Sequence, residues 1–200
     1  CISSAASDVY KRQAQIRPVE SLPIAVNYSK TIHLIFPSAV KYSQAVTDFV
    51  AVDNPENVPH ILRIKANSKS FSKQTTVSVA TEGGFFYSFN VSYADSLEQT
   101  NYFLPDMRSI APDTVFINEV SQTHLIAPEK VIYIDYGDTC INVSKAENTE
   151  NIIRMIARSG RVQQFPKQTN VSFATESGRF FTFNVDYREK PEALSLIHIS

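Results

Sequence analysis

Apolar and polar residues alternate along several short segments of this chain, and a period of two residues is typical of β-strands. The clearest case is residues 87–93, YSFNVSY, in which Tyr, Phe, Val and Tyr fall on one face and polar residues on the other. Residues 181–187, FTFNVDY, repeat the pattern. The alternation predicts strands that bury one face against a core.

A β-hairpin is predicted to include each of these strands. Val77 and Val79 alternate with polar residues upstream of 87–93, and residues 81–84, TEGG, separate the two runs. The corresponding separator before 181–187 is residues 175–178, TESG. Glycine reaches positive φ at little cost, and tight hairpin turns require such a conformation.

The similarity between the two hairpins belongs to an internal duplication. Residues 71–93 return with few changes as residues 165–187. Upstream, HLIFP at 33–37 recurs as HLIAP at 124–128, and ILRIKA at 61–66 recurs as IIRMIA at 152–157. The offset changes from 91 to 94 residues between these blocks, because the second copy contains three extra residues after Ala157. That insertion predicts a surface loop. The duplication indicates that one β-rich module occurs twice in the chain.

The pattern predicts an all-β protein of two tandem homologous β-sandwich (Ig-like) modules with about seven strands each. Leu34 and Ile35 are adjacent and both apolar, so their strand is expected to be buried between two layers. Besides the hairpins, strands are predicted at 24–28, 32–36, 40–42, 49–52 and 61–66, and in the second copy at 115–118, 123–127, 131–134, 140–143 and 152–157.

Module 1 is predicted to span residues 14–93 and module 2 residues 114–193, with a linker at 94–113 that contains two prolines and no clear period. Residues 1–13 and 194–200 resemble translated sequencing-adapter read-through and are excluded from the fold prediction. The alternative for these ends is an N-terminal arm and a short C-terminal strand. Modules of this size bury only about 60% of their unfolded surface, so each gains from docking against its twin or another subunit.

Composition excludes several classes of function. Lys and Arg number 19 against 20 Asp and Glu, so there is no basic excess of the kind that binds a phosphate backbone. No run of 18 apolar residues is present, so no segment is predicted to cross a bilayer as a helix. Once Cys1 is excluded with the first thirteen residues, Cys140 has no cysteine with which to form an intramolecular disulfide.

No catalytic, cofactor-binding or metal-binding residue is predicted. His33 and His124 occupy equivalent positions, but neither has a second histidine or cysteine at ligand spacing. They are interpreted as strand histidines bonded to a neighbouring backbone group or hydroxyl. The acidic residues that the two copies share fall in predicted loops, where carboxylates commonly shape turns. They are Glu56, Glu82, Glu147 and Glu176.

Four residues are candidates for contact with other proteins. Arg63 and Arg154 are equivalent charges inside apolar strands, where a charge without a partner is costly. Either they project to solvent with their stems covering apolar surface, or they form intermodule or intersubunit ion pairs. Tyr102 and Phe103, in the predicted linker, are the other two candidates because their rings are available to pack on a neighbouring domain.

The order of motifs resembles the TraN family of Bacteroides-type conjugative transposons. The resemblance is carried by VNYSKT at 26–31, HLIFPS at 33–38, LRIKA at 62–66 and FYSFNVSYAD at 86–95. Residues 114–190 match the same pattern more loosely, with Ala127 for Phe36 and Cys140 for Phe49. More distantly, the chain resembles the N-terminal β-domain of CagX/TrbG-type subunits of type IV secretion core complexes.

This resemblance implies a non-enzymatic structural subunit of a conjugative DNA-transfer apparatus. Such a subunit would be periplasmic or associated with the outer membrane and would bind other transfer proteins of the envelope in a multisubunit assembly. The resemblance implies no catalytic residue, no cofactor and no direct contact with nucleic acid. The larger C-terminal domain that the TraN resemblance leads us to expect is not found in this sequence.

Two other functions are left open. A surface adhesin or carbohydrate-binding module would require an aromatic platform, with Tyr28, Tyr42 or Tyr133 together on one solvent face. An envelope hydrolase would instead require a pocket that gathers at least two of Asp53, Glu56 and His60.

Overall fold

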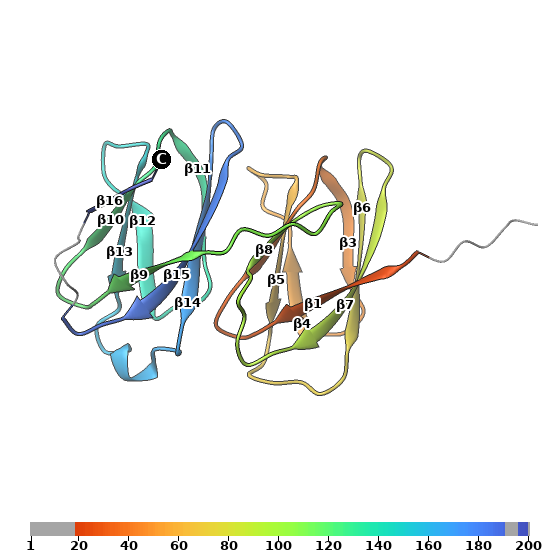
Figure 1. The fold of residues 1–200 in the computed structure, drawn as a ribbon, viewed down its shortest axis with the longest axis horizontal. Helices are drawn as coiled ribbons and strands as arrows, with labels where there is room; N and C mark the ends of the chain where they lie inside the picture. Colours follow the sequence, from red (N-terminus) through yellow and green to blue (C-terminus); the bar gives the residue numbers. More distant parts are fainter. Residues whose placement is uncertain (1–18, 191–195, 200) are drawn as a thin grey trace, which may run out of the picture.

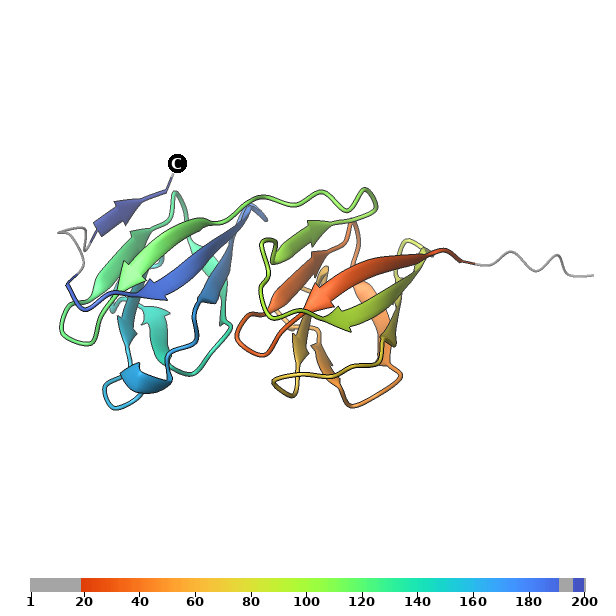
Figure 2. The same cartoon turned by 60° about the horizontal axis from the view of Figure 1, so that its bottom comes forward.

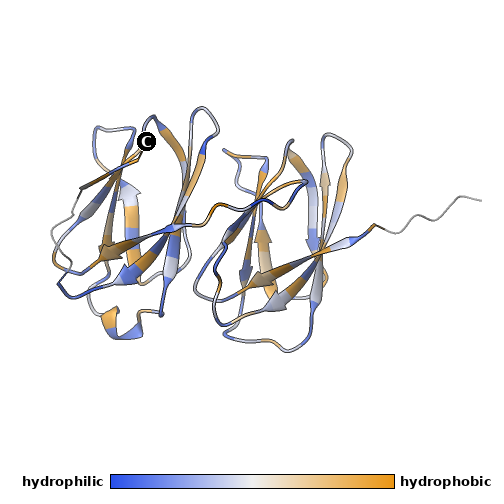
Figure 3. Ribbon diagram, viewed as in Figure 1, coloured by the Kyte–Doolittle hydropathy of each residue, from blue (hydrophilic) through white to orange (hydrophobic). Residues whose placement is uncertain are grey.

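A computed structural model describes residues 19–190 and 196–199 and contains two β-sandwich modules in tandem (Figure 1). The predicted all-β, Ig-like class is confirmed. Hydrophobic segments lie mainly on the strands, as the alternation predicted (Figure 3). No helix among the described residues is long and apolar enough to cross a membrane.

Each module consists of two four-stranded sheets with the same strand order. Module 1 has the sheets β1-β7-β6-β3 and β4-β5-β2-β8, and module 2 has β9-β15-β14-β11 and β12-β13-β10-β16. The module 1 strands are β1 (Ser21–Val26), β2 (Ile32–Ile35), β3 (Val40–Ala45), β4 (Val50–Asp53), β5 (Ile61–Ala66), β6 (Thr75–Thr81), β7 (Phe86–Tyr93) and β8 (Asn101–Phe103).

Module 2 repeats this order and adds one short helix. Its elements are β9 (Asp113–Ile117), β10 (Thr123–Ile126), β11 (Val131–Tyr136), β12 (Ile141–Lys145), β13 (Ile152–Ala157), the 3-10 helix η1 (Val162–Gln164), β14 (Thr169–Thr175), β15 (Phe180–Tyr187) and β16 (Leu196–His198). The helix η1 lies in the loop for which the three extra residues were noted. Most neighbouring strands are antiparallel, but β1 with β7, β2 with β8, and their module 2 counterparts run parallel.

The predicted linker is partly a strand. Residues 101–103 form β8, which pairs with β2, so His33 lies opposite Asn101 and Leu34 opposite Tyr102. The interpretation of 94–113 as linker is therefore wrong for this segment, because a three-residue strand is too short to show a period. From β8 the chain continues along one side of the molecule to β9 (Figure 2).

The two ends were predicted to lie outside the fold. Residues 196–198 form β16, which pairs with β10 at the position that β8 has beside β2. This is the short C-terminal strand that was considered as the alternative for that end. Residues 1–13 lie outside the described residues, and the adapter origin of both ends remains a prediction.

Each module has its own apolar core between its two sheets. Phe89 and Leu34 are fully buried in the core of module 1, and Phe173 and Leu125 are fully buried in that of module 2. The predicted hairpin turns are present, with Gly84 at φ 79° and Gly178 at φ 86°. Alternation within the strands accounts for the inner faces of the sheets, which form these cores. The outer faces differ between the two modules.

Candidate interaction site at the junction of the two modules

The two modules meet through the outer faces of two sheets. Sheet β4-β5-β2-β8 of module 1 lies against sheet β11-β14-β15-β9 of module 2 (Figure 1). All four residues of β2 and all seven of β14 are buried, because each strand faces its own core on one side and the other module on the other. The prediction that Leu34 and Ile35 are buried on both sides of one strand is confirmed, and module 2 is the second layer.

An apolar cluster occupies one part of this junction. Its members come from both modules and are buried together: Ile35, Val58 and Ile61 from module 1, and Tyr133, Ala174 and Phe180 from module 2. Phe103 of β8 and Ile132 of β11 pack against it. Because these side chains lie on outer faces, they would meet water if the modules separated, so their burial favours one fixed arrangement.

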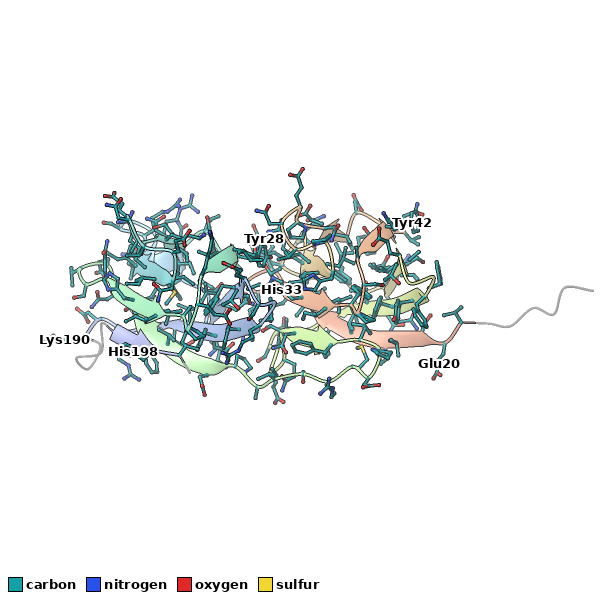
Figure 4. All side chains as sticks on the ribbon, turned by 90° about the horizontal axis from the view of Figure 1, so that it is seen from above. Glu20, Tyr28, His33, Tyr42, Lys190 and His198 are labelled. Carbon is teal, nitrogen blue, oxygen red and sulfur yellow. The ribbon has the colours of Figure 1, made fainter. Side chains whose placement is uncertain are left out.

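His33 lies at the centre of the junction and is fully buried (Figure 4). Its Nε2 is 3.0 Å from the hydroxyl of Tyr133 and 3.5 Å from Oδ2 of Asp135, and its ring centroid is 5.1 Å from that of Phe180. The interpretation of His33 as a histidine bonded to a hydroxyl is confirmed, although the hydroxyl belongs to the other module. Among the described residues, His33 Nδ1 has no hydrogen-bond partner.

Arg63 forms an ion pair across the junction. Its guanidinium donates to Asp135 Oδ1 at 2.7 Å and also pairs with the carboxylate of Asp53 within module 1. Of the two interpretations of Arg63, the intermodule ion pair is the one observed. Burial of Asp135 disfavours its charge, but the nearby ring of His33 and the guanidinium of Arg63 hold the pKa of Asp135 below its usual range.

Backbone groups of the loop after β1 are held by side chains of β14. Asn170 accepts a hydrogen bond from Thr31 N and donates one to Thr31 O, both at 2.9 Å. Thr169 Oγ1 donates to Ser29 O at 2.7 Å. Gly137 allows this approach, because a Cβ atom there would lie 2.4 Å from Asn170 Oδ1 and 2.5 Å from Ser29 O.

Lys30 inserts a buried ammonium group between the modules. Its Nζ donates to Leu97 O at 3.0 Å, Gln168 Oε1 at 2.5 Å and Asn184 Oδ1 at 2.8 Å. Burial lowers the pKa of Lys30, and the nearby charge of Asp186 only partly opposes this effect. The three acceptors occupy all three donors of the ammonium group, which is the condition under which a buried charge is tolerated.

The four predicted contact residues have different environments. Arg63 and Phe103 lie in the junction, as described above. Tyr102 points the other way from β8 and packs on the core of module 1, and burial raises the pKa of its hydroxyl. Arg154 lies on the outer face of module 2, where its Nε donates to Ser144 Oγ at 2.8 Å. The structure therefore brings together two of the four.

The tyrosines of the carbohydrate-binding alternative are separated, and one carboxylate of the hydrolase alternative is held in an ion pair. Tyr133 is buried against His33, whereas Tyr28 and Tyr42 are exposed, so the three rings do not share a solvent face. The carboxylate of Asp53 is engaged by Arg63. Within residues 19–190 and 196–199, no three His, Cys, Asp or Glu side chains are arranged to hold a metal ion.

Several junction residues were not predicted, and they share one property. Asn170, Asp135, Gly137 and Lys30 correspond to Thr76, Gln44, Val46 and Ser121 in the other copy, so each differs between the modules. Positions kept in both copies mostly serve the fold that the copies share. The signal for the junction was instead a residue that differs between the copies within otherwise similar segments.

Comparison with known proteins agrees with the duplication. A family model described as a domain of unknown function (DUF8473) matches residues 24–97 and 115–191, which is one match in each module and most of the chain in total. No curated protein sequence matches the chain.

Solved structures resemble the chain only weakly. An endo-fucoidan hydrolase, MfFcnA4 from glycoside hydrolase family 107, is 8% identical with a TM-score of 0.28, and the match covers 90% of this chain and 28% of that one. The Bacteroides ovatus mixed-linkage glucan utilization locus protein SGBP-B, in complex with a mixed-linkage heptasaccharide, is 10% identical with a TM-score of 0.24, covering 88% and 46%. Protocadherin Gamma C5 EC1-3 is 10% identical with a TM-score of 0.26, covering 84% and 66%.

The chain spans less than two thirds of the length of each of these three proteins. With TM-scores below 0.5, none of these likenesses enters the functional argument.

Proposed function

This chain belongs to the DUF8473 family, and we propose that it is a non-enzymatic structural subunit of a cell-envelope assembly, acting by protein–protein binding. The observation that carries the proposal is the junction, in which apolar, hydrogen-bonded and ionic contacts all hold one module on the other. Two modules joined in this way form one stiff unit. A stiff unit suits a subunit that holds its partners at a set distance.

The chemistry of the junction supports a structural role for its charged residues. Arg63, Asp135 and Lys30 are the groups that first suggest a reactive site, and each one is engaged by side chains or backbone groups of the other module. A buried charge with such partners is stabilised by them, and a reaction that used the charged group would break these contacts between the modules. The arrangement of these three residues favours a structural role over a catalytic one.

We further propose that the assembly is a conjugative DNA-transfer apparatus of the periplasm or outer membrane. The support is the motif series at 26–38, 62–66 and 86–95, which resembles the TraN family. In this proposal, other envelope transfer proteins bind the exposed sheet edges and outer faces of the modules, including by addition of a strand to a sheet.

The test is affinity capture of the tagged full-length protein from cells that carry the transfer genes, followed by mass spectrometry of the captured proteins. Enrichment of envelope transfer proteins over an untagged control supports the proposal. The matched control is the variant Asn170→Ala, which disturbs the junction while leaving both outer ends unchanged. Capture that recovers no transfer protein, from cells in which the apparatus is assembled, would count against the conjugative role.

A further inference from the structure

The face that module 2 contributes to the junction has a close counterpart at the far end of module 1. Sheet β1-β7-β6-β3 matches β9-β15-β14-β11 strand for strand, and Tyr42 and Phe86 hold the positions of Tyr133 and Phe180. Module 1 covers Tyr133 and Phe180, which are 7% and 9% exposed, whereas Tyr42 and Phe86 are 46% and 49% exposed. The same pair of aromatic side chains is therefore covered in module 2 and exposed in module 1.

The face that module 1 contributes to the junction also has a counterpart, on the outer side of sheet β12-β13-β10-β16. Arg154 holds the position of Arg63, and Ile156 replaces Lys65. Ile126 and Ile152 correspond to Ile35 and Ile61, which are buried in the junction cluster. These three isoleucines are all partly exposed, so this face of module 2 presents more apolar surface than a sheet facing only water requires.

These two bare faces lie at opposite ends of the molecule (Figure 1). The strands β3, β6 and β7 lie at one end of the long axis, and β10, β12 and β13 lie at the other. Figure 4 labels Tyr42 at the end of module 1 that is remote from module 2. One chain therefore cannot bring its own two bare faces together.

We propose that copies of this chain associate head to tail. In this arrangement, the outer face of β10 and β13 in one copy covers Tyr42 and Phe86 of the next copy. The proposal deepens the proposed structural function and rests on it, because it names a second copy as a binding partner. A contact between two different faces builds a ring if the rotation closes and a filament if it does not.

The second copy is favoured over other occupants because the complementary surface is already present in the chain. The junction shows how a face bearing Ile35, Ile61 and Arg63 packs on one bearing Tyr133 and Phe180. Several differences lower the expected affinity. Thr76 holds the position of Asn170 and Val46 that of Gly137, so the contact between copies lacks the hydrogen bonds of Asn170 to a backbone segment and the close approach that Gly137 allows. Gln44 holds the position of Asp135, so Arg154 would meet an amide in place of a carboxylate, and the contact between copies lacks the ion pair of the junction.

Sedimentation velocity over a hundredfold range of protein concentration tests the proposal, using two variants that each block one face. Phe86→Asp blocks the module 1 face, and Ile152→Asp blocks the module 2 face. Each variant alone is expected to weaken self-association at least about tenfold. An equimolar mixture of the two is expected to form dimers and nothing larger, because each copy retains one intact face and the two intact faces are complementary.

The control variant is Ile110→Asp, which changes a residue that is 57% exposed in the segment connecting β8 to β9, away from both end faces, and should leave association unchanged. Circular dichroism checks that each variant is folded, and Ile152→Gln replaces Ile152→Asp if the charged variant is not. A wild-type chain that stays monomeric at every concentration overturns the proposal. So does association that survives both blocking variants, or a mixture that does not restore the dimer.

The two proposals fail in different ways. A monomeric chain that still captures envelope transfer proteins would refute head-to-tail association and leave the proposed function standing. A chain that associates head to tail but captures no transfer protein would retain the contact described here and refute the conjugative role.

Discussion

Asn170 of module 2 holds both backbone groups of Thr31 of module 1, accepting from its N–H and donating to its C=O at 2.9 Å each. Both residues are buried, so neither backbone group has water as a substitute partner. A side-chain amide matches a peptide unit in this way because it carries one donor and one acceptor side by side. Together with the apolar cluster and the ion pair, this contact holds the two modules in one arrangement.

Replacing Asn170 with alanine is expected to destabilise the protein by about 2–4 kcal/mol, since two buried backbone groups lose their partner. Urea unfolding followed by circular dichroism measures the change. The matched control is Thr76→Ala at the equivalent, partly exposed position of module 1. The control should change stability by no more than about 0.5 kcal/mol. Equal effects of the two variants would contradict the role assigned to Asn170.

Replacing Gly137 with alanine is expected to push the modules apart, because the added Cβ would lie within 3 Å of Asn170 Oδ1, Ser29 O and Lys30 Cα. Overpacking of this kind costs about 1–3 kcal/mol. Hydrogen exchange of the Thr31 amide should become faster. In the control Gly83→Ala, the nearest atom is the Ser38 hydroxyl oxygen at 3.0 Å, which can rotate away, so that exchange rate should not change.

Low pH is expected to weaken the junction through Asp135. Its pKa is lower in the folded protein than in the unfolded chain, so the carboxylate contributes its full stability above the unfolded pKa of about 3.9. This contribution is lost as the pH falls through the lower, folded-state pKa. Urea midpoints between pH 6 and pH 2 should therefore fall more steeply for the wild type than for Asp135→Asn.

At neutral pH, Asp135→Asn should already be less stable by about 1.5–3 kcal/mol, because Arg63 loses a charged acceptor. Asp106→Asn serves as the control, since the Asp106 side chain is exposed. A variant at Asp135 with the same pH profile as the wild type would show that the ion pair does not contribute to the junction.

The thiol of Cys140 is expected to be inert in the folded protein. It is buried, and burial together with the charge of Asp138 raises its pKa to about 12. At pH 8, a thiol-specific reagent should label Cys140 slowly in buffer and rapidly in concentrated urea. The measurement uses a Cys1→Ser chain so that Cys140 is the single thiol. Rapid labelling without denaturant would mean that module 2 opens readily at β12.

Much of the fold could be predicted because the signals are local. Residues 61–66 and 152–157 were predicted as strands with the bounds that the structure has, and the hairpin turns at Gly84 and Gly178 followed from the demand for positive φ. The segment 101–103 was predicted as linker because its pairing with β2 depends on a residue pair almost seventy positions apart. Such a pairing leaves no period in three residues.

The candidate site was predictable only in part. Arg63 stood out because a charge inside an apolar strand requires a partner, and that partner is Asp135. Arg154 gave the same signal from the same motif, yet it bonds to Ser144 on the outer face of its own module. Two arginines at equivalent positions of equivalent strands thus have different environments, because only the first lies opposite another module.

By itself, the sequence determined the module, its duplication and the inner faces of its sheets, since alternation and turn residues act over a few positions along the chain. Only the tertiary structure decided which outer face is covered. Tyr133 and Tyr42 occupy equivalent places in equivalent strands, and one is buried against His33 while the other is exposed. The difference lies in what packs against each ring from residues distant in the sequence, and no local pattern encodes that neighbour.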